Sequence, residues 1–123
     1  MNARASWRGH ARRSCAVLLA VFAATAGIAQ SMLEVPPLRA HVTDVAGVLV
    51  PDRRDALDSR LAQIERDTHA QLAVLIVATT YGEPIESFAV RVWDIWKLGV
   101  AGRDDGVLIV LARDDRAARI ATG

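Results

Sequence analysis

The feature that most constrains the fold is a short, wholly apolar run that directly follows two adjacent carboxylates. Residues 106–112 read Gly-Val-Leu-Ile-Val-Leu-Ala, and Asp104 and Asp105 stand immediately before them. Unbroken apolar runs of this kind are typical of strands that are buried in a sheet with helices on its faces. A charge persists beside such a strand only where it meets solvent or a partner. The pattern therefore predicts a buried strand with an acidic site at its amino end.

The spacing of apolar residues predicts two helices and three further strands, in the order β-α-β-α-β-β. The predicted elements are a short strand at 41–44, a helix at Pro51–Thr68, a strand at Gln71–Thr79, a helix at Ile85–Leu98, and a hairpin of Gly106–Ala112 with Ala117–Thr122. Because strand-helix-strand crossovers are right-handed and join parallel strands, we expect an α/β fold with helices packed on a mixed sheet. No third helix follows the hairpin, so we expect the domain to be incomplete at its C-terminus.

The N-terminus is predicted to be a secretory signal peptide. Arginines precede an apolar stretch at Cys15–Ala26, and small residues follow up to Ala29, which is the order found in such leaders. The apolar stretch is shorter than the about 20 residues that span a bilayer. We therefore expect export to the periplasm or the extracellular space, with membrane association through a segment outside this sequence as an alternative, and no membrane span in residues 30–123. The predicted organisation is a leader at 1–29, an extended lead-in at 30–40 that serves as a tether, and one domain at 41–123.

Removal of the leader changes the charge of the chain. Four of the 15 basic residues lie in it and none of the 14 acidic residues does, so the remaining chain is net negative. That charge argues against a nucleic-acid partner. Cys15, the single cysteine, also leaves with the leader, so the exported domain has no disulfide. No P-loop, nucleophile elbow or zinc-ligand spacing occurs, and we expect no organic cofactor.

From Val35 to Gly123 the chain resembles the TPM domain family. The resemblance rests on four segments in a fixed order: Val42–Leu49, Gln71–Val77, Trp96–Gly99, and Asp104–Val110 with Arg119–Gly123. Two features depart from the family pattern: Val50 stands where the family usually has a serine, and the family continues past the equivalent of Gly123 with a tyrosine-glycine turn and further helices. Members are described as metal-binding modules, as acid phosphatases, and as accessory factors in photosystem repair or receptor assembly. The resemblance alone therefore implies no single reaction.

Asp104 and Asp105 are the predicted ligands of a divalent cation. Calcium and magnesium prefer oxygen ligands, and calcium takes about six to eight of them, so two acids need help from Asp44, a backbone carbonyl and water. Asp44 can join them only if the first strand is antiparallel to its neighbour. In a parallel arrangement it lies near Thr80 at the opposite edge, where open α/β sheets usually bind ligands. Alternatively, the two acids face solvent and pair with Arg103.

The other chemically active side chains are predicted to have structural roles: His41, His69, Trp93, Trp96, Asp114 and Asp115. Neither histidine has a cysteine or histidine at metal-ligand spacing. The two tryptophans share a helix with apolar neighbours and are expected to pack that helix on the sheet. The aspartate pair is expected to solvate the hairpin turn.

The leading hypothesis is a non-catalytic, exported module that binds calcium or magnesium through Asp104, Asp105 and Asp44. We expect it to serve an unidentified protein or membrane-complex partner in maintaining the envelope or membrane proteins. The alternative is a metal-assisted acid phosphatase, in which the cation polarises a phosphoryl oxygen. A second alternative is an interaction domain without an ion. Binding is favoured over catalysis because no nucleophile and base pair can be identified, so catalytic residues and substrate are left unassigned.

Overall fold

The computed structural model describes residues 31–99 and 102–123, and six elements of secondary structure lie in these ranges. They are β1 (Val42–Asp44), α1 (Pro51–Thr68), β2 (Gln71–Val77), α2 (Ile85–Trp96), β3 (Gly106–Ala112) and β4 (Ala117–Thr122). All of them belong to one compact unit, Ser31–Gly123. The predicted leader at residues 1–29 lies outside the described residues.

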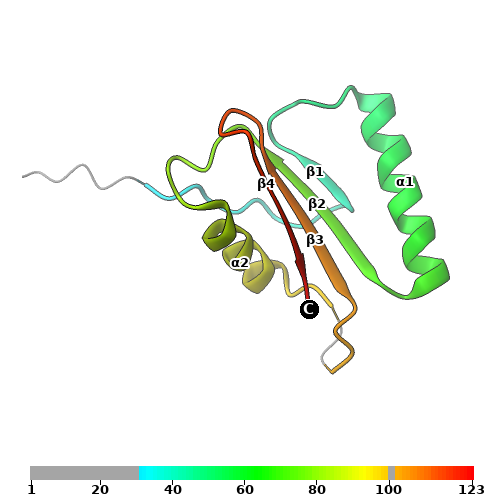
Figure 1. Cartoon of the computed structure of the whole chain (residues 1–123). Coiled ribbons are helices and arrows are strands. Elements are labelled where there is room, and N and C mark those ends of the chain that lie inside the picture. Colours follow the sequence, from blue (N-terminus) through cyan, green and yellow to red (C-terminus); the bar gives the residue numbers. More distant parts are fainter. Residues whose placement is uncertain (1–30, 100–101) are drawn as a thin grey trace, which may run out of the picture. The chain divides into compact units, whose positions relative to one another are not determined.

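The strands of the described ranges form one mixed sheet in the order β1-β2-β3-β4. β1 and β3 both run parallel to β2, whereas β4 pairs with β3 in antiparallel orientation. Figure 1 shows α1 on one side of the sheet and α2 on the other. α1 contacts β1 and β2, and α2 contacts β3 and β4. The predicted α/β class and element order are therefore confirmed.

Most of the core lies between α2 and the sheet. Its largest fully buried side chains come from α2, β2 and β3: Phe88, Val92, Leu75, Val77, Leu108 and Val110. Burying one such side chain stabilises the fold by roughly 1.5–3 kcal/mol relative to leaving it exposed. This cluster is therefore the main apolar contribution to stability among the described residues.

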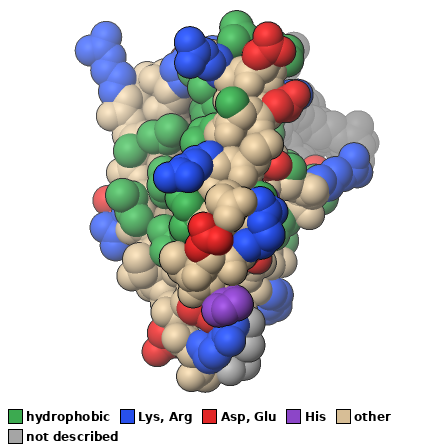
Figure 2. Space-filling model, turned by 90° about the vertical axis from the view of Figure 1, so that its right-hand side faces the viewer, with side chains coloured by type: hydrophobic (Ala, Val, Ile, Leu, Met, Phe, Trp, Pro, Cys, Tyr) green, Lys and Arg blue, Asp and Glu red, His purple; other side chains and the backbone are tan. Residues whose placement is uncertain are grey.

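The opposite face of the sheet is covered only in part. No residue of α1 is buried, although Leu61 packs with Val42, Val74 and Ile76 in a second, smaller cluster. Burial along β3 consequently alternates between buried and half-buried side chains. This differs from the prediction of a strand covered on both faces, because α1 extends over β1 and β2 alone. Figure 2 views the molecule from this side and shows hydrophobic side chains open to solvent.

Residues 31–40 form neither helix nor strand, but they are not the free tether that the sequence predicted. Apolar side chains of the segment pack against the α2-side core, namely Leu33, Val35 and Leu38. Two side chains of α2 also donate hydrogen bonds to backbone carbonyls of residues 31–40. Arg91 donates to the carbonyl of Leu33 at 2.9 Å, and Trp96 Nε1 donates to the carbonyl of Pro36 at 2.7 Å. The lead-in is thus part of the folded unit.

The ends of the helices follow from local backbone rules. Val50 precedes α1 without a side-chain cap, and Pro51 occupies the first turn, where its missing N–H needs no partner. α2 ends at Trp96, two residues before the predicted end, because Lys97 adopts a left-handed conformation with φ 53° and turns the chain. Neither described helix is long and apolar enough to cross a bilayer.

Candidate functional site

The orientation of β1 determines the position of Asp44, which the sequence left open. β1 is parallel to β2, with Asp44 opposite Ile76. Asp44 therefore lies at the end of the sheet where the parallel strands β1, β2 and β3 finish, here called the carboxyl edge; the end where they begin is called the amino edge. Its carboxylate accepts hydrogen bonds from the backbone N–H groups of Val48 at 3.2 Å and Leu49 at 2.7 Å. Asp44 therefore shapes the loop between β1 and α1.

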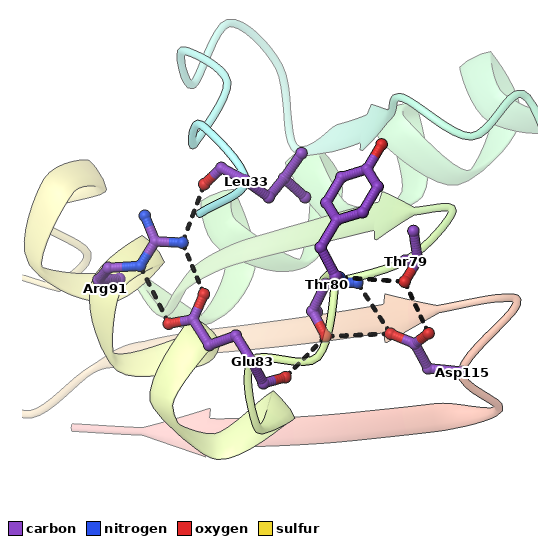
Figure 3. Close-up of polar contacts among 7 residues, drawn as sticks. Leu33, Thr79, Thr80, Glu83, Arg91 and Asp115 are labelled. Atoms are coloured by element: carbon purple, nitrogen blue, oxygen red, sulfur yellow. Dashed lines mark hydrogen bonds and ion pairs between the residues drawn. The ribbon is translucent and has the colours of Figure 1, made fainter. Parts of the chain in front are cut away.

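Asp115 forms hydrogen bonds with Thr79 and Thr80 at the same edge, and these three residues are here called the clip (Figure 3). Its carboxylate accepts from the Thr79 hydroxyl at 2.7 Å and from the Thr80 backbone N–H at 2.8 Å. The buried Thr80 hydroxyl lies 3.0 Å from the same carboxylate and 2.7 Å from the carbonyl of Glu83, and its single hydrogen serves one acceptor at a time. The hydrogen bond from the Thr80 N–H, and to a smaller extent the one from the Thr79 hydroxyl, lower the pKa of Asp115. The clip joins the β3–β4 turn to the loop after β2.

An ion pair with two hydrogen bonds between Glu83 and Arg91, here called the fork, holds the start of α2 and the lead-in together (Figure 3). Arg91 Nη2 lies 2.7 Å and Nε 3.1 Å from the two carboxylate oxygens of Glu83. The hydrogen bonds to Glu83 raise the pKa of Arg91. The guanidinium also stacks 5.3 Å from the centroid of the Phe88 ring. Glu83 is therefore engaged in holding the fold.

Asp104 and Asp105 lie at the opposite, amino edge of the sheet, directly before β3. The Asp105 carboxylate is 2.8 Å from Arg103 Nε, and its backbone carbonyl accepts from the N–H of Gln71 at 2.8 Å. Asp104 is exposed and has a left-handed backbone with φ 47°. The adjacent acids thus differ in environment: Asp105 pairs with a cation, as the alternative interpretation of the sequence expected, whereas Asp104 faces outward.

Asp104 lines an open cavity of about 370 Å³ at the amino edge. The other lining residues are Trp93, Asp94, Lys97, Leu98, Gly99, Gly102 and Gly123. Asp94 adds a second carboxylate and Lys97 adds a positive charge. Gly106 lets the cavity wall approach the sheet, because a Cβ at this position would lie 2.8 Å from Trp93 Cη2. The cavity can offer carboxylate oxygens to a cation, with one ammonium group opposing it.

The three predicted ligands are not brought together. Asp44 lies level with Leu111 of β3, six residues beyond Asp105, which corresponds to roughly 20 Å at about 3.3 Å per strand residue. Within residues 31–99 and 102–123, no group of three His, Cys, Asp or Glu side chains could hold a metal ion. An ion bound by Asp104 therefore needs other oxygen ligands than Asp44.

His41 links the start of β1 to α1. Its Nε2 lies 2.5 Å from a carboxylate oxygen of Glu65, and its Nδ1 lies 4.0 Å from Asp58. Asp58 also accepts from the backbone N–H of Val42 at 2.9 Å. These contacts suit a structural role for His41. His69 is exposed at the C-cap of α1.

The arrangement defines a small α/β domain with one helix on each face of a mixed sheet and separate polar clusters at its two edges. The sequence profile of the TPM domain matches residues 42–123, and the chain belongs to this family. It is also similar to the solution NMR structure of the N-terminal domain of a protein from P. gingivalis, with a TM-score of 0.63 and 30% identity. That match covers 68% of this chain and 54% of the other, so the chain spans about half the length of that relative. A comparison with curated proteins gave no match.

Proposed function

We propose that the chain is a non-catalytic, exported TPM module that binds a divalent cation at the amino edge of its sheet, with calcium preferred over magnesium. We further propose that it assists the maintenance of the envelope or of membrane proteins. The observation that carries the proposal is that Asp104 and Asp94 line the same open cavity. Hard cations favour carboxylate oxygens, and water and backbone carbonyls can complete the coordination shell.

The carboxyl edge supports this choice by contrast. There Asp44 is bound by two backbone N–H groups, Asp115 by Thr79 and Thr80, and Glu83 by Arg91. A cation at that edge would have to displace these internal donors. At the amino edge, Asp104 faces a cavity, and Asp105 can add an oxygen ligand only by giving up contacts that include the one with Arg103. Binding is therefore easier to accommodate at the amino edge.

Binding is favoured over phosphatase chemistry by the roles of the acids and of His41. General acid or base catalysis requires a side chain that can reach a substrate proton. Asp115 and Glu83 each hold a loop or a helix start, and His41 contacts Glu65. These side chains are therefore held in structural contacts, and taking up or releasing a proton during catalysis would disturb those contacts.

The test is the thermal stability of the full chain in a calcium titration after chelation, with magnesium run in parallel. Asp104→Asn removes the proposed ligand, and Asp114→Asn is the matched control because Asp114 is an exposed acid paired with Arg113 at the other edge. An ion that binds only the folded state stabilises it, by about 2.7 kcal/mol at a concentration of about 100 times Kd. We expect a saturable rise in melting temperature that Asp104→Asn removes and Asp114→Asn preserves.

Other outcomes would contradict the proposal. An equal rise in the Asp104→Asn variant would remove the amino-edge site. No rise in the unmodified chain would favour an interaction domain without an ion. Hydrolysis of a phosphate ester that needs calcium and is lost in Asp104→Asn would replace the non-catalytic assignment with a metal-assisted phosphatase.

A further inference from the structure

β4 is an outer strand of the sheet, and one side of its backbone is open (Figure 1). In an antiparallel pair, residues that exchange hydrogen bonds with the neighbouring strand alternate with residues whose N–H and C=O point away from it. Gly123 follows β4 opposite Gly106, and its N–H donates to the Gly106 carbonyl. This bond sets the alternation along β4. The backbone groups of Ala118, Ile120 and Thr122 therefore point away from β3.

The two outer strands of the sheet are protected to different degrees. β1 has only three residues and packs against α1, and short or covered outer strands discourage pairing with another chain. β4 has six residues in an unbroken register with β3, without a proline or a bulge. Its single charged residue, Arg119, lies on the α2 side of the sheet, because it is opposite the buried Val110. β4 is thus open to pairing with a further strand.

The centre of β4 exposes an apolar side chain. Ile120 is 62% exposed. It lies opposite Ile109 of β3, which in turn lies opposite Val74 of β2. These three side chains form an apolar row on the face of the sheet that α1 covers only in part. The row ends at the open side of β4, so an apolar residue on a further strand would continue it.

We infer that β4 pairs in antiparallel orientation with β4 of a second copy, about a two-fold axis at Ile120, so that the two sheets become one. In this register Ile120 meets the partner's Ile120, and Ala118 meets the partner's Thr122. All the residues with outward backbone groups then exchange hydrogen bonds. The apolar row continues through both copies, with small side chains beside it. The same surface serves both copies, so the assembly closes as a dimer.

The position of Arg119 favours this register over its neighbours. With the axis at Ile120, Arg119 lies opposite the partner's Ala121, which is small and uncharged. An axis at Arg119 would place the two guanidinium groups directly opposite each other, and like charges in this position destabilise a strand pair. Moving the axis to Arg119 or to Ala121 also leaves two hydrogen-bonding residues in each strand in place of three. Charge and backbone geometry therefore select the same register.

The pairing goes beyond the proposed cation binding and does not depend on it, because neither Asp94 nor Asp104 takes part. Sedimentation of the full chain over a series of concentrations, with a chelator present, tests it, and we expect a monomer in equilibrium with a dimer. Ile120→Lys removes the apolar contact and places like charges at the axis, so it should raise the dissociation constant by about tenfold. Val90→Lys is the matched control, because Val90 is 60% exposed but lies on α2, and it should leave the constant unchanged.

A mixture of variants tests the register. Ile120→Lys and Ile120→Glu should each associate weakly alone, and an equimolar mixture should recover the dimer, because opposite charges then meet at the axis. Mixing Val90→Lys with Val90→Glu should change nothing. In a sample of isotopically labelled and unlabelled unmodified chain, we expect a nuclear Overhauser effect between the α-protons of Arg119 and the partner's Ala121, since the two strands approach most closely at such pairs.

Four results would overturn the inference. They are a monomer at every concentration, association that Ile120→Lys leaves unchanged, a mixture as weak as its components, and no contact between Arg119 and the partner's Ala121. The first would leave the open side of β4 to a segment of another protein, and the second would assign the association to residues outside β4. Circular dichroism shows whether each variant folds. If Ile120→Lys does not fold, the contact in the unmodified chain decides the question.

Discussion

Replacing Gly106 with alanine should destabilise the domain through a steric conflict that can be located in advance. A Cβ at this position would lie 2.8 Å from Trp93 Cη2 and 3.0 Å from the backbone N of Gly99. Carbon contacts are most favourable at about 3.5–4.0 Å, so the neighbours would have to move. Gly99 cannot move freely, because its N–H donates to Gln71 Oε1 at 2.7 Å. Overpacking of this kind costs about 1–3 kcal/mol.

We therefore expect Gly106→Ala to lower the free energy of unfolding by about 2 kcal/mol and the melting temperature by roughly 8–16 °C. Chemical and thermal unfolding of the full chain measure both quantities. Gly47→Ala is the control, because a Cβ there meets nothing within 4 Å and the cost comes from its φ of 65° alone. That cost should be about 1 kcal/mol.

A double-mutant cycle separates the two mechanisms. In a Trp93→Ala background the cost of Gly106→Ala should fall by about 1 kcal/mol, while the cost of Gly47→Ala should stay the same. A loss below about 0.5 kcal/mol for Gly106→Ala, within the range of ordinary surface substitutions, would refute the steric argument. An unchanged cost in the Trp93→Ala background would show that the indole does not limit the space.

Three further predictions concern the polar contacts. The folded-state pKa of Asp115 is lowered, so its contribution to stability is present above the unfolded pKa of about 3.9 and is lost as pH falls through the lower folded value. Asp115→Asn should flatten the stability profile below about pH 4 in acid unfolding, and a parallel profile would contradict this. Arg91→Met should raise amide exchange in residues 31–40. Glu83→Gln keeps an oxygen acceptor for Arg91 but loses the charge, so it should raise exchange less. Equal protection in the unmodified chain and both variants would exclude the Glu83–Arg91 pair as an anchor of this segment. Trp96→Phe should lower the free energy of unfolding by about 1 kcal/mol through loss of the hydrogen bond to Pro36, and further through the smaller buried ring. Denaturant unfolding measures this loss, and an unchanged midpoint would contradict the contribution of that hydrogen bond.

The elements of the fold could be predicted because each has a strong local signal. The apolar run at Gly106–Ala112 and the polar turn after it predicted β3 and its hairpin. The proline at position 51 marked the start of α1. The depth of burial could not be predicted from these patterns, because it depends on how far α1 reaches across the sheet. Ile109 and Leu111 are half-buried for that reason.

The candidate site could be predicted only in part. Asp104 and Asp105 lie directly before β3, at the amino edge, as their place before an apolar run predicted, and their binding of an ion stays a prediction. Asp44 could not be assigned to an edge, because its position depends on the orientation of a three-residue strand. The clip at Asp115 was missed because its threonine partners are 35 and 36 positions away and carry no motif. Asp94 was missed because it lies on a helix whose apolar face dominated the pattern.

The most direct test of the account is to locate calcium by amide NMR of the isotopically labelled chain, since chemical shifts report the bound position residue by residue. If calcium binds at the amino edge, saturable shifts should appear at Asp94, Gly99 and Asp104, and the amides of Val48 and Leu49 should stay unchanged. Shifts confined to Val48 and Leu49 would place the ion beside Asp44, at the carboxyl edge, and no saturable shift anywhere would contradict cation binding altogether.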